Sequence, residues 1–223
     1  MTITRQSAND LTRMSNAVFY VSPSFGGLQV RAAFGAGTEN FGDVAGQPAS
    51  RSRVFGLSGE YRSGPLYVGA AYMLRRDADT AVATGDSLAN TKFAVLGATY
   101  GIGIVSFNAG VSRLDPALDS ATNGRTTAYW VGAGVSVGAG QVLAQYGQTR
   151  VDTTAATDPR ARIYGVAYVH PVSKRTNLYA AYGTVRNSAG AAFNMDTGGN
   201  AVAAGGGLGS DPSAVAFGVR HTF

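Results

Sequence analysis

The amino-acid sequence predicts an all-β fold, a transmembrane antiparallel β-barrel, from strict alternation, segment length and the lengths of the connections. Composition supports this class. The chain has 223 residues, of which 31 are Gly, none is Cys and 14% are charged. So much Gly opposes a helical bundle, because Gly destabilises helix interiors. The absence of Cys excludes disulfide frameworks and thiolate metal sites. A hydrophobic content of 45% with 10% aromatic residues argues against disorder.

Apolar and polar residues alternate along most of the chain. In the stretch LQVRAAFGA at 28–36, Leu28, Val30 and Phe34 lie on one face, whereas Gln29 and Arg31 lie on the other. This period of two indicates strands with two unlike faces. Most segments have about 10 residues, the length with which a tilted strand crosses a bilayer. About eleven such segments are found, near 16–21, 28–38, 53–62, 65–76, 91–100, 103–113, 126–138, 141–151, 160–170, 176–187 and 213–223.

The two faces differ in an informative way. One carries aromatic and aliphatic side chains, and the other carries Gly, Ser, Asn, Gln and few charges. A soluble sandwich would instead show many Lys and Glu residues on its outer face. The pattern therefore predicts a wall with lipid outside and water inside.

The connections alternate between short and long. Short turns are expected at 22–27, 63–64, 101–103, 138–140 and 171–175, and long loops near 39–52, 77–90, 114–125, 152–159 and 188–212. Outer-membrane barrels have short periplasmic turns and longer extracellular loops. The odd strand count would leave two unpaired edges, which are costly in lipid. We therefore expect the C-terminal part of a larger barrel.

Three stretches resemble one family. They are SNAVFYVSPSFGG at 15–27, PVSKRTNLYA at 171–180 and FGVRHTF at 217–223. They are similar to a strand and turn after the constriction loop, a late periplasmic turn and the last strand of the Gram-negative trimeric general porins. The resemblance implies a 16-stranded barrel, of which this chain supplies about 11 C-terminal strands. Residues 1–14 would be the tail of the constriction-loop region, and 15–223 the partial barrel.

The same resemblance implies a function. The family forms homotrimers in the cell outer membrane, with water-filled channels for passive diffusion of small hydrophilic solutes and ions. Expected partners are outer-membrane lipid and the barrel-assembly machinery, and neither enzymatic activity, a cofactor nor a metal is expected. One departure concerns Phe19 and Val21, where the family often has an arginine and an acidic residue. By parity, that is, because residues two apart in a strand share a face, both side chains face the lumen. This part of the wall therefore carries fewer charges than in relatives that have the arginine and the acidic residue.

Candidate pore-lining residues follow from parity. The polar face is predicted to carry Arg31, Glu60, Arg62, Lys92 and Arg220, with Arg75 and Arg162 near strand ends as further candidates. The net charge is +5, which predicts a mild anion preference. The arginines are scattered, which argues against nucleic-acid binding. The resemblance also implies an assembly signal formed by Gly218, His221 and Phe223.

Other interpretations remain open at this stage. An autotransporter-type translocator or adhesin barrel would need a helix through its lumen, and residues 5–14 are short and polar. A barrel phospholipase or protease would need a catalytic constellation, which His170 and His221 do not suggest. A soluble sandwich that binds a partner is the remaining case. The Gly- and Ala-rich loop at 188–212 is interpreted as variable extracellular surface rather than a cover of the pore mouth.

Overall fold

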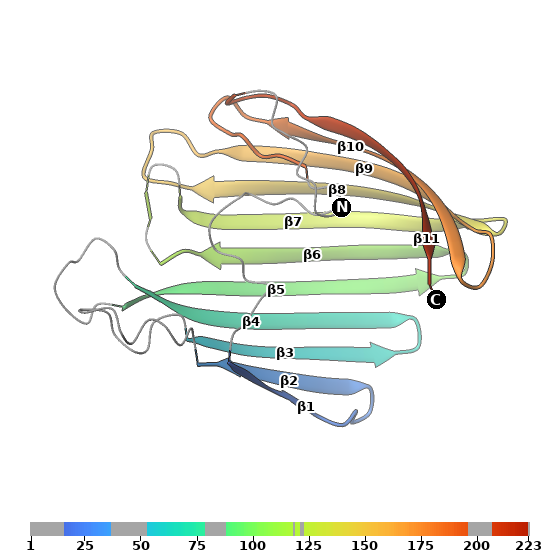
Figure 1. The fold of residues 1–223 in the computed structure, drawn as a ribbon, viewed down its shortest axis with the longest axis horizontal. Coiled ribbons are helices and arrows are strands. Elements are labelled where there is room, and N and C mark those ends of the chain that lie inside the picture. The colour runs from blue at the N-terminus through green and yellow to red at the C-terminus, as the bar shows by residue number, and fades with distance from the viewer. Residues whose placement is uncertain are drawn as a thin grey trace.

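A computed structural model describes residues 16–36, 53–78, 88–117, 119–120, 123–195 and 207–222. They form one antiparallel sheet of eleven strands, in which each strand pairs with its neighbours in sequence (Figure 1). The strands are β1 (Ala17–Val21), β2 (Leu28–Gly35), β3 (Val54–Ser63), β4 (Leu66–Ala78), β5 (Leu88–Ile102), β6 (Val105–Asp115), β7 (Arg125–Val137), β8 (Gly140–Asp152), β9 (Arg160–Pro171), β10 (Thr176–Asn187) and β11 (Ser213–His221).

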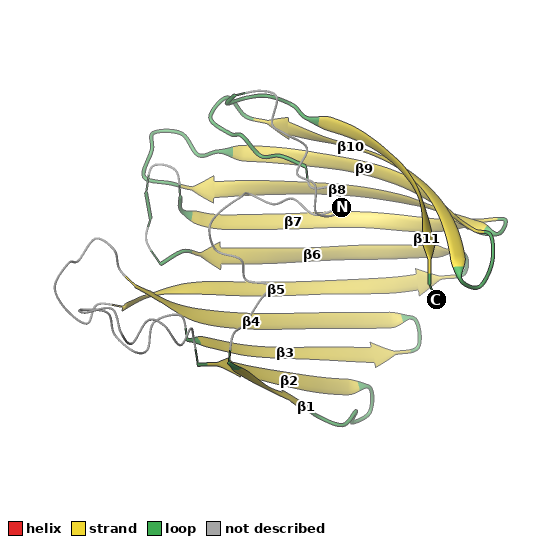
Figure 2. Cartoon of the chain, in the orientation of Figure 1, coloured by secondary structure: helices red, strands yellow, loops and turns green. Residues whose placement is uncertain are grey.

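The eleven predicted strands and the short turns between them are confirmed, whereas much of the predicted long loops lies outside the described residues. The largest shifts are at the end of β2, which ends at Gly35 rather than near residue 38, and at the start of β5, which begins at Leu88 rather than near residue 91. Tight turns join the strands at one end of the sheet, and the strand ends that flank the longer connections, such as Gly35 and Val54, lie at the opposite end (Figure 2). Two of these turns contain Gly64 and Gly138, with φ angles of 53° and 58°. Glycine fits these positions because it has no Cβ to clash in the left-handed region.

The register is continuous along each ladder. Between β3 and β4, for example, it runs from Val54 opposite Arg75 to Ser63 opposite Leu66 without a bulge. In an antiparallel ladder, partner residues point to the same side of the sheet. The face of every described strand residue can therefore be followed from β1 to β11.

The sheet has little interior of its own. Large apolar side chains on one face stay exposed, including Phe55 at 48%, Val131 at 52% and Phe217 at 77%. The hydrophobic cluster that is buried is small and consists of Val151, Ala161, Val185, Ala191, Phe193 and Met195. Within the described residues, β1 and β11 do not pair with each other, so the sheet is open. A soluble protein rarely leaves so continuous an apolar surface uncovered.

None of the described segments is a helix of sufficient length and hydrophobicity to span a membrane.

Candidate pore wall

The continuous register defines two faces of the sheet. The inner face is the one that carries Arg31, and the outer face is the one that carries Phe34. Along β2 and β3 the outer face pairs Phe34 with Phe55, whose rings lie 5.1 Å apart. The inner face pairs Gln29 with Glu60. The outer face is thus apolar and the inner face polar, as the alternation predicted.

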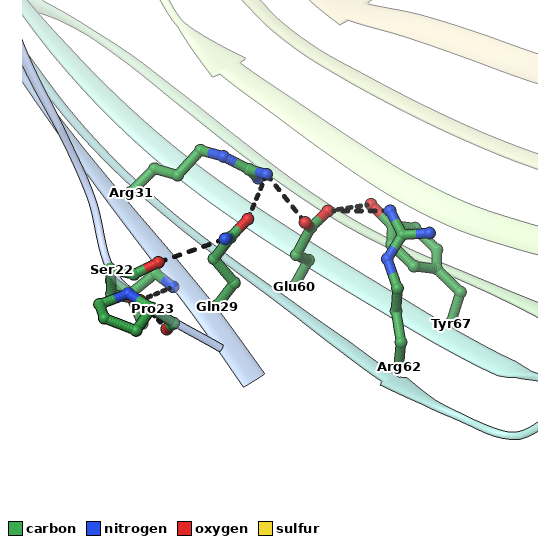
Figure 3. A network of polar contacts seen from close by, with 8 residues as sticks. Ser22, Pro23, Gln29, Arg31, Glu60, Arg62 and Tyr67 are labelled. Atoms are coloured by element: carbon green, nitrogen blue, oxygen red, sulfur yellow. Dashed lines mark hydrogen bonds and ion pairs between the residues drawn. The ribbon is translucent and has the colours of Figure 1, made fainter. Parts of the chain in front are cut away.

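Glu60 is the centre of a polar network on the inner face (Figure 3). Arg31 Nη2 donates to Glu60 Oε1 at 2.8 Å, and Arg62 Nη2 lies 3.3 Å from Oε2. The Tyr67 hydroxyl donates to the same Oε2 at 3.3 Å, and the Arg62 guanidinium lies 4.6 Å from the centre of the Tyr67 ring. Strands β2, β3 and β4 therefore bring two cations to one carboxylate, which leaves this patch of the wall positive.

A second set of contacts orients Arg31. Its Nη2 also donates to Gln29 Oε1 at 2.5 Å, and Gln29 Nε2 donates to the carbonyl oxygen of Ser22 at 3.2 Å. The guanidinium is held between Gln29 and Glu60 at a defined position on the wall. A cation held at a fixed position on a surface that contacts water attracts anions and repels other cations near that surface.

Trp130 is an inner-face residue that parity reasoning did not single out. It is the cross-strand partner of Gly110, and a Cβ at Gly110 would lie 2.2 Å from its Cζ2. Together with Arg31, Glu60, Tyr67 and Asn108, it lines a shallow hollow of about 610 Å³. Tyr129 and Trp130 are adjacent aromatics, so composition does not reveal which of them faces inward. Gly110 leaves room for the indole and so indicates that Trp130 faces inward, but this pairing is known only once the register is known.

The remaining wall residues divide between the faces. Val21 is the partner of Arg31 and Phe19 the partner of Ala33, so both lie on the inner face as predicted. Arg75 also lies on the inner face, opposite Val54. Arg220 lies on this face too, opposite Asn177.

Lys92 does not lie where parity placed it. Its partners are Leu74 on β4 and Asp115 on β6, and Leu74 is itself opposite Phe55 on the outer face. The prediction of an inner position is therefore wrong. Phe93 and Val95 take the inner face instead, because the register is set over the whole strand rather than by one charge near its end. Arg162 is likewise an outer-face residue, opposite Gln148 and Arg186.

The three residues of the expected assembly signal are only partly described. Gly218 lies on the inner face beneath Tyr179, whose ring atoms occupy the space that a Cβ would take. His221 is on the outer face, and its Nδ1 lies 2.9 Å from the Thr176 hydroxyl. Phe223 lies outside the described residues.

Residues 188–195 cover part of the inner face. Their side chains Ala191, Phe193 and Met195 pack on Val151 and Val185, which belong to the inner faces of β8 and β10. This part of the 188–212 loop therefore packs on the wall, in contrast to its interpretation as variable extracellular surface, while residues 196–206 lie outside the described residues. Burial of apolar side chains against the wall outweighs the mobility that a Gly- and Ala-rich sequence suggests.

Asn187 fixes this segment at the end of β10. Its Nδ2 donates to the carbonyl oxygens of Phe193, at 3.0 Å, and Ser210, at 2.5 Å. The Phe193 amide donates back to Asn187 Oδ1 at 3.0 Å. Arg186 and the Asn187 amide both donate to Asp211, which holds the pKa of that carboxyl below its usual range.

The described residues contain no group of three or more His, Cys, Asp or Glu side chains that could hold a metal ion. His170 lies 3.1 Å from the Tyr168 hydroxyl, which belongs to the same strand. The other histidine, His221, contacts the Thr176 hydroxyl through its Nδ1.

Comparison with known proteins identifies the family that this wall represents. The sequence profile of the Gram-negative porins matches residues 1–190. The chain belongs to the Gram-negative porin family. It is 29% identical over 214 residues to outer membrane porin protein 32 of Delftia acidovorans, covering 95% of this chain and 57% of that relative. An outer-membrane location follows from this family.

Solved porins share the fold. The anion-selective porin from Comamonas acidovorans superposes with a TM-score of 0.72 and 25% identity, covering 94% of this porin chain and 60% of that structure. The OmpF porin of Salmonella typhi gives a TM-score of 0.67 at 15% identity, covering 93% of this chain and 62% of that structure. The chain thus spans less than two thirds of these relatives. These matches support a porin and give no support to the autotransporter alternative.

Proposed function

We propose that the eleven strands form part of the wall of a water-filled outer-membrane channel, through which small hydrophilic solutes and ions diffuse passively. The division of the sheet into two unlike faces is the observation that carries this proposal. An apolar face that stays exposed suits contact with lipid, and a face of glycine, small polar residues and paired charges suits contact with water. Further strands that pair with β1 and β11 would close the barrel and satisfy both open edges.

A mild preference for anions is part of the proposal. Arg31 and Arg62 share the single carboxylate of Glu60, so the network has an excess of one positive charge. Arg75 and Arg220 add positive charge to the same face. The solved relative from Comamonas acidovorans is described as anion-selective, which agrees with this sign.

The proposed assembly is a homotrimer embedded in outer-membrane lipid. Gly218, His221 and Phe223 would act in recognition by the barrel-assembly machinery. The exposed outer side chains of β11, such as Phe217, suit contact with lipid or with a second subunit. Neither a catalytic role nor a cofactor is proposed.

Planar-bilayer recording of the natural protein that contains this chain tests the proposal. We expect stable, voltage-independent conductance at low voltage that closes in successive steps, one for each subunit. Under a KCl gradient, the reversal potential should have the sign of chloride preference. A protein that inserts into the bilayer without conducting would contradict the channel, and a reversal potential of the opposite sign would contradict the anion preference.

A further inference from the structure

The outer face carries a group of arginines that the channel does not use. Near the end of β8, the start of β9 and the end of β10, beyond the apolar part of these strands, the outer face carries four arginines. They are Arg150, Arg160, Arg162 and Arg186. We name these four residues the outer arginine patch. Its position on the outer face separates it from the network around Glu60.

The patch contains two like-charged cross-strand pairs. Arg150 is the partner of Arg160, and Arg162 is the partner of Arg186. Like charges directly opposite each other in a sheet are destabilising, because their Cβ atoms lie about 4.5–5.5 Å apart. Two such pairs next to each other create a local excess of positive charge that nearby anionic groups would relieve.

Nearby carboxylates neutralise the two outer members of the patch, Arg150 and Arg186. Asp158 accepts from Arg150 Nη2 at 2.6 Å, and Asp211 accepts from Arg186 Nη1 at 2.8 Å. Asp152 lies 2.8 Å from Arg150 Nε. Among the described residues, the guanidinium groups of Arg160 and Arg162 form neither an ion pair nor a hydrogen bond with a side chain. Both side chains are exposed. Asp158 interacts with Arg160 only electrostatically, so the guanidinium donors of Arg160 and Arg162 are not used in hydrogen bonds to side chains within the described part of the chain.

The position of the patch along the strands, relative to the membrane surface, indicates which anion would reach it. Below Arg162 on the outer face of β9 come Tyr164, Val166 and Tyr168. Tyr164 packs on Tyr146 of β8, with ring centres 5.4 Å apart. Tyrosines gather at the level of lipid headgroups, where their apolar rings meet water. Arg162 lies two residues beyond Tyr164, about 7 Å along the strand, which is headgroup level.

We propose that the outer arginine patch binds the phosphate groups of a phosphorylated lipid headgroup in the outer leaflet, with Arg160 and Arg162 as the principal donors. Guanidinium groups bind phosphate through two parallel hydrogen bonds, so two adjacent arginines can hold one phosphate from both sides. The patch would fix the height of the wall in the membrane and hold lipid against β8–β10. This inference rests on the proposed channel, because it requires the outer face to contact lipid.

Lipid retention by the natural full-length protein tests this proposal. The protein is purified in mild detergent, incubated with lipid A that carries its two phosphates, and examined by native mass spectrometry. The double variant R160Q/R162Q should retain lipid A about tenfold less than the natural protein, equivalent to about 1.4 kcal/mol of binding free energy. The matched control K92Q removes an outer-face cation outside the patch and should retain lipid A normally.

Further arms of the experiment separate the alternatives. Dephosphorylated lipid A should bind the natural protein as weakly as lipid A binds the double variant. Equal retention of lipid A by the double variant and the natural protein would overturn the proposal. If the natural protein binds inorganic phosphate but does not retain lipid A, the proposal that the bound phosphate belongs to a lipid is wrong. Loss of subunit association in the double variant would make the patch a protein contact and overturn it as well.

Bilayer conductance distinguishes this proposal from the channel. If the double variant conducts normally but retains lipid A undiminished, the patch proposal fails and the channel stands. If the natural protein retains lipid A through the patch but never conducts, the channel fails instead.

Discussion

The two ends of the sheet use the same inner face in opposite ways. On β2–β4 this face is open and charged, with Arg31 and Arg62 arranged around Glu60. On β8–β11 it is covered by residues 188–195, and Val151 and Val185 are completely buried beneath them. Parity assigns a residue to a face, but it does not say whether that face contacts water or another part of the chain. The difference predicts that the first region governs charge selectivity and the second governs the width of the channel.

The largest expected effect lies between the two regions, at Gly110. A Cβ there would lie 2.2 Å from the Trp130 ring, so Gly110→Val should force the indole away and lower the free energy of unfolding by about 3 kcal/mol. Urea unfolding of the folded protein in detergent measures this. The control Gly59→Val adds the same side chain where no heavy atom lies within 4 Å of the Cβ position. If Trp130→Ala fails to rescue the Gly110→Val variant, the contact with the ring is not the cause.

Release of the covering segment is the second expected effect. Asn187→Ala removes its two donor bonds and the one it accepts from the Phe193 amide, which should destabilise the segment by about 2 kcal/mol. Single-channel conductance should then rise, because residues 188–195 would leave the wall. Asn177→Ala is the matched control, since Asn177 lies on the inner face near the opposite end of β10. An unchanged conductance with a released segment would contradict the assignment of channel width to this region.

Charge changes on the open region should alter selectivity and leave the fold intact. Glu60→Gln should raise the chloride preference, and Arg31→Gln should lower it, each by about twofold in the permeability ratio. The reversal potential under a KCl gradient gives this ratio. Lys92→Gln removes an outer-face cation and should change nothing, so a comparable shift in that variant would refute the division into faces.

Acidification provides the smallest expected effect. The pKa of Asp211 is lowered, first by the hydrogen bond from Arg186 and next by the one from the Asn187 amide. The stabilisation of the folded state by the Asp211 carboxylate is therefore fully present above the pKa of Asp in the unfolded chain, about 3.9. It is lost as the pH falls through the lower pKa that Asp211 has in the folded protein. A fluorescent label on Ala189→Cys, in a chain without natural cysteine, should become more mobile below that pH. Asp211→Asn should abolish the pH dependence, and persistence of the dependence in that variant would assign it to another group.

Much of the wall could be predicted from local pattern. Alternation leaves an unambiguous apolar face in the segments 28–38 and 160–170 and so predicts both strands, and glycine predicts the turns at 63–64 and 138–140. The same alternation predicts the polar face for Arg31, Glu60, Arg62 and Arg220, and the register agrees. The face of Lys92 is not predictable from its own strand, because β5 has apolar residues on both faces and only the pairing with Leu74 places Lys92 on the outer one.

The contacts that give the wall its character could not be predicted in this way. Glu60 meets Arg31 and Tyr67 from neighbouring strands, and Arg162 faces Arg186, because hydrogen-bonded pairing fixes which residues are opposite each other. Residues 188–195 fold inward because Phe193 and Met195 find an apolar surface on β8–β10 that is assembled from three separate segments.

The sequence by itself determined that this chain forms a two-faced antiparallel wall, because a period of two in hydrophobicity is a property of each strand alone. The tertiary structure decided which charges meet, which part of the inner face is covered and where the outer arginines gather. Those outcomes depend on register across strands, and register is set by the sum of many pairings rather than by any one segment.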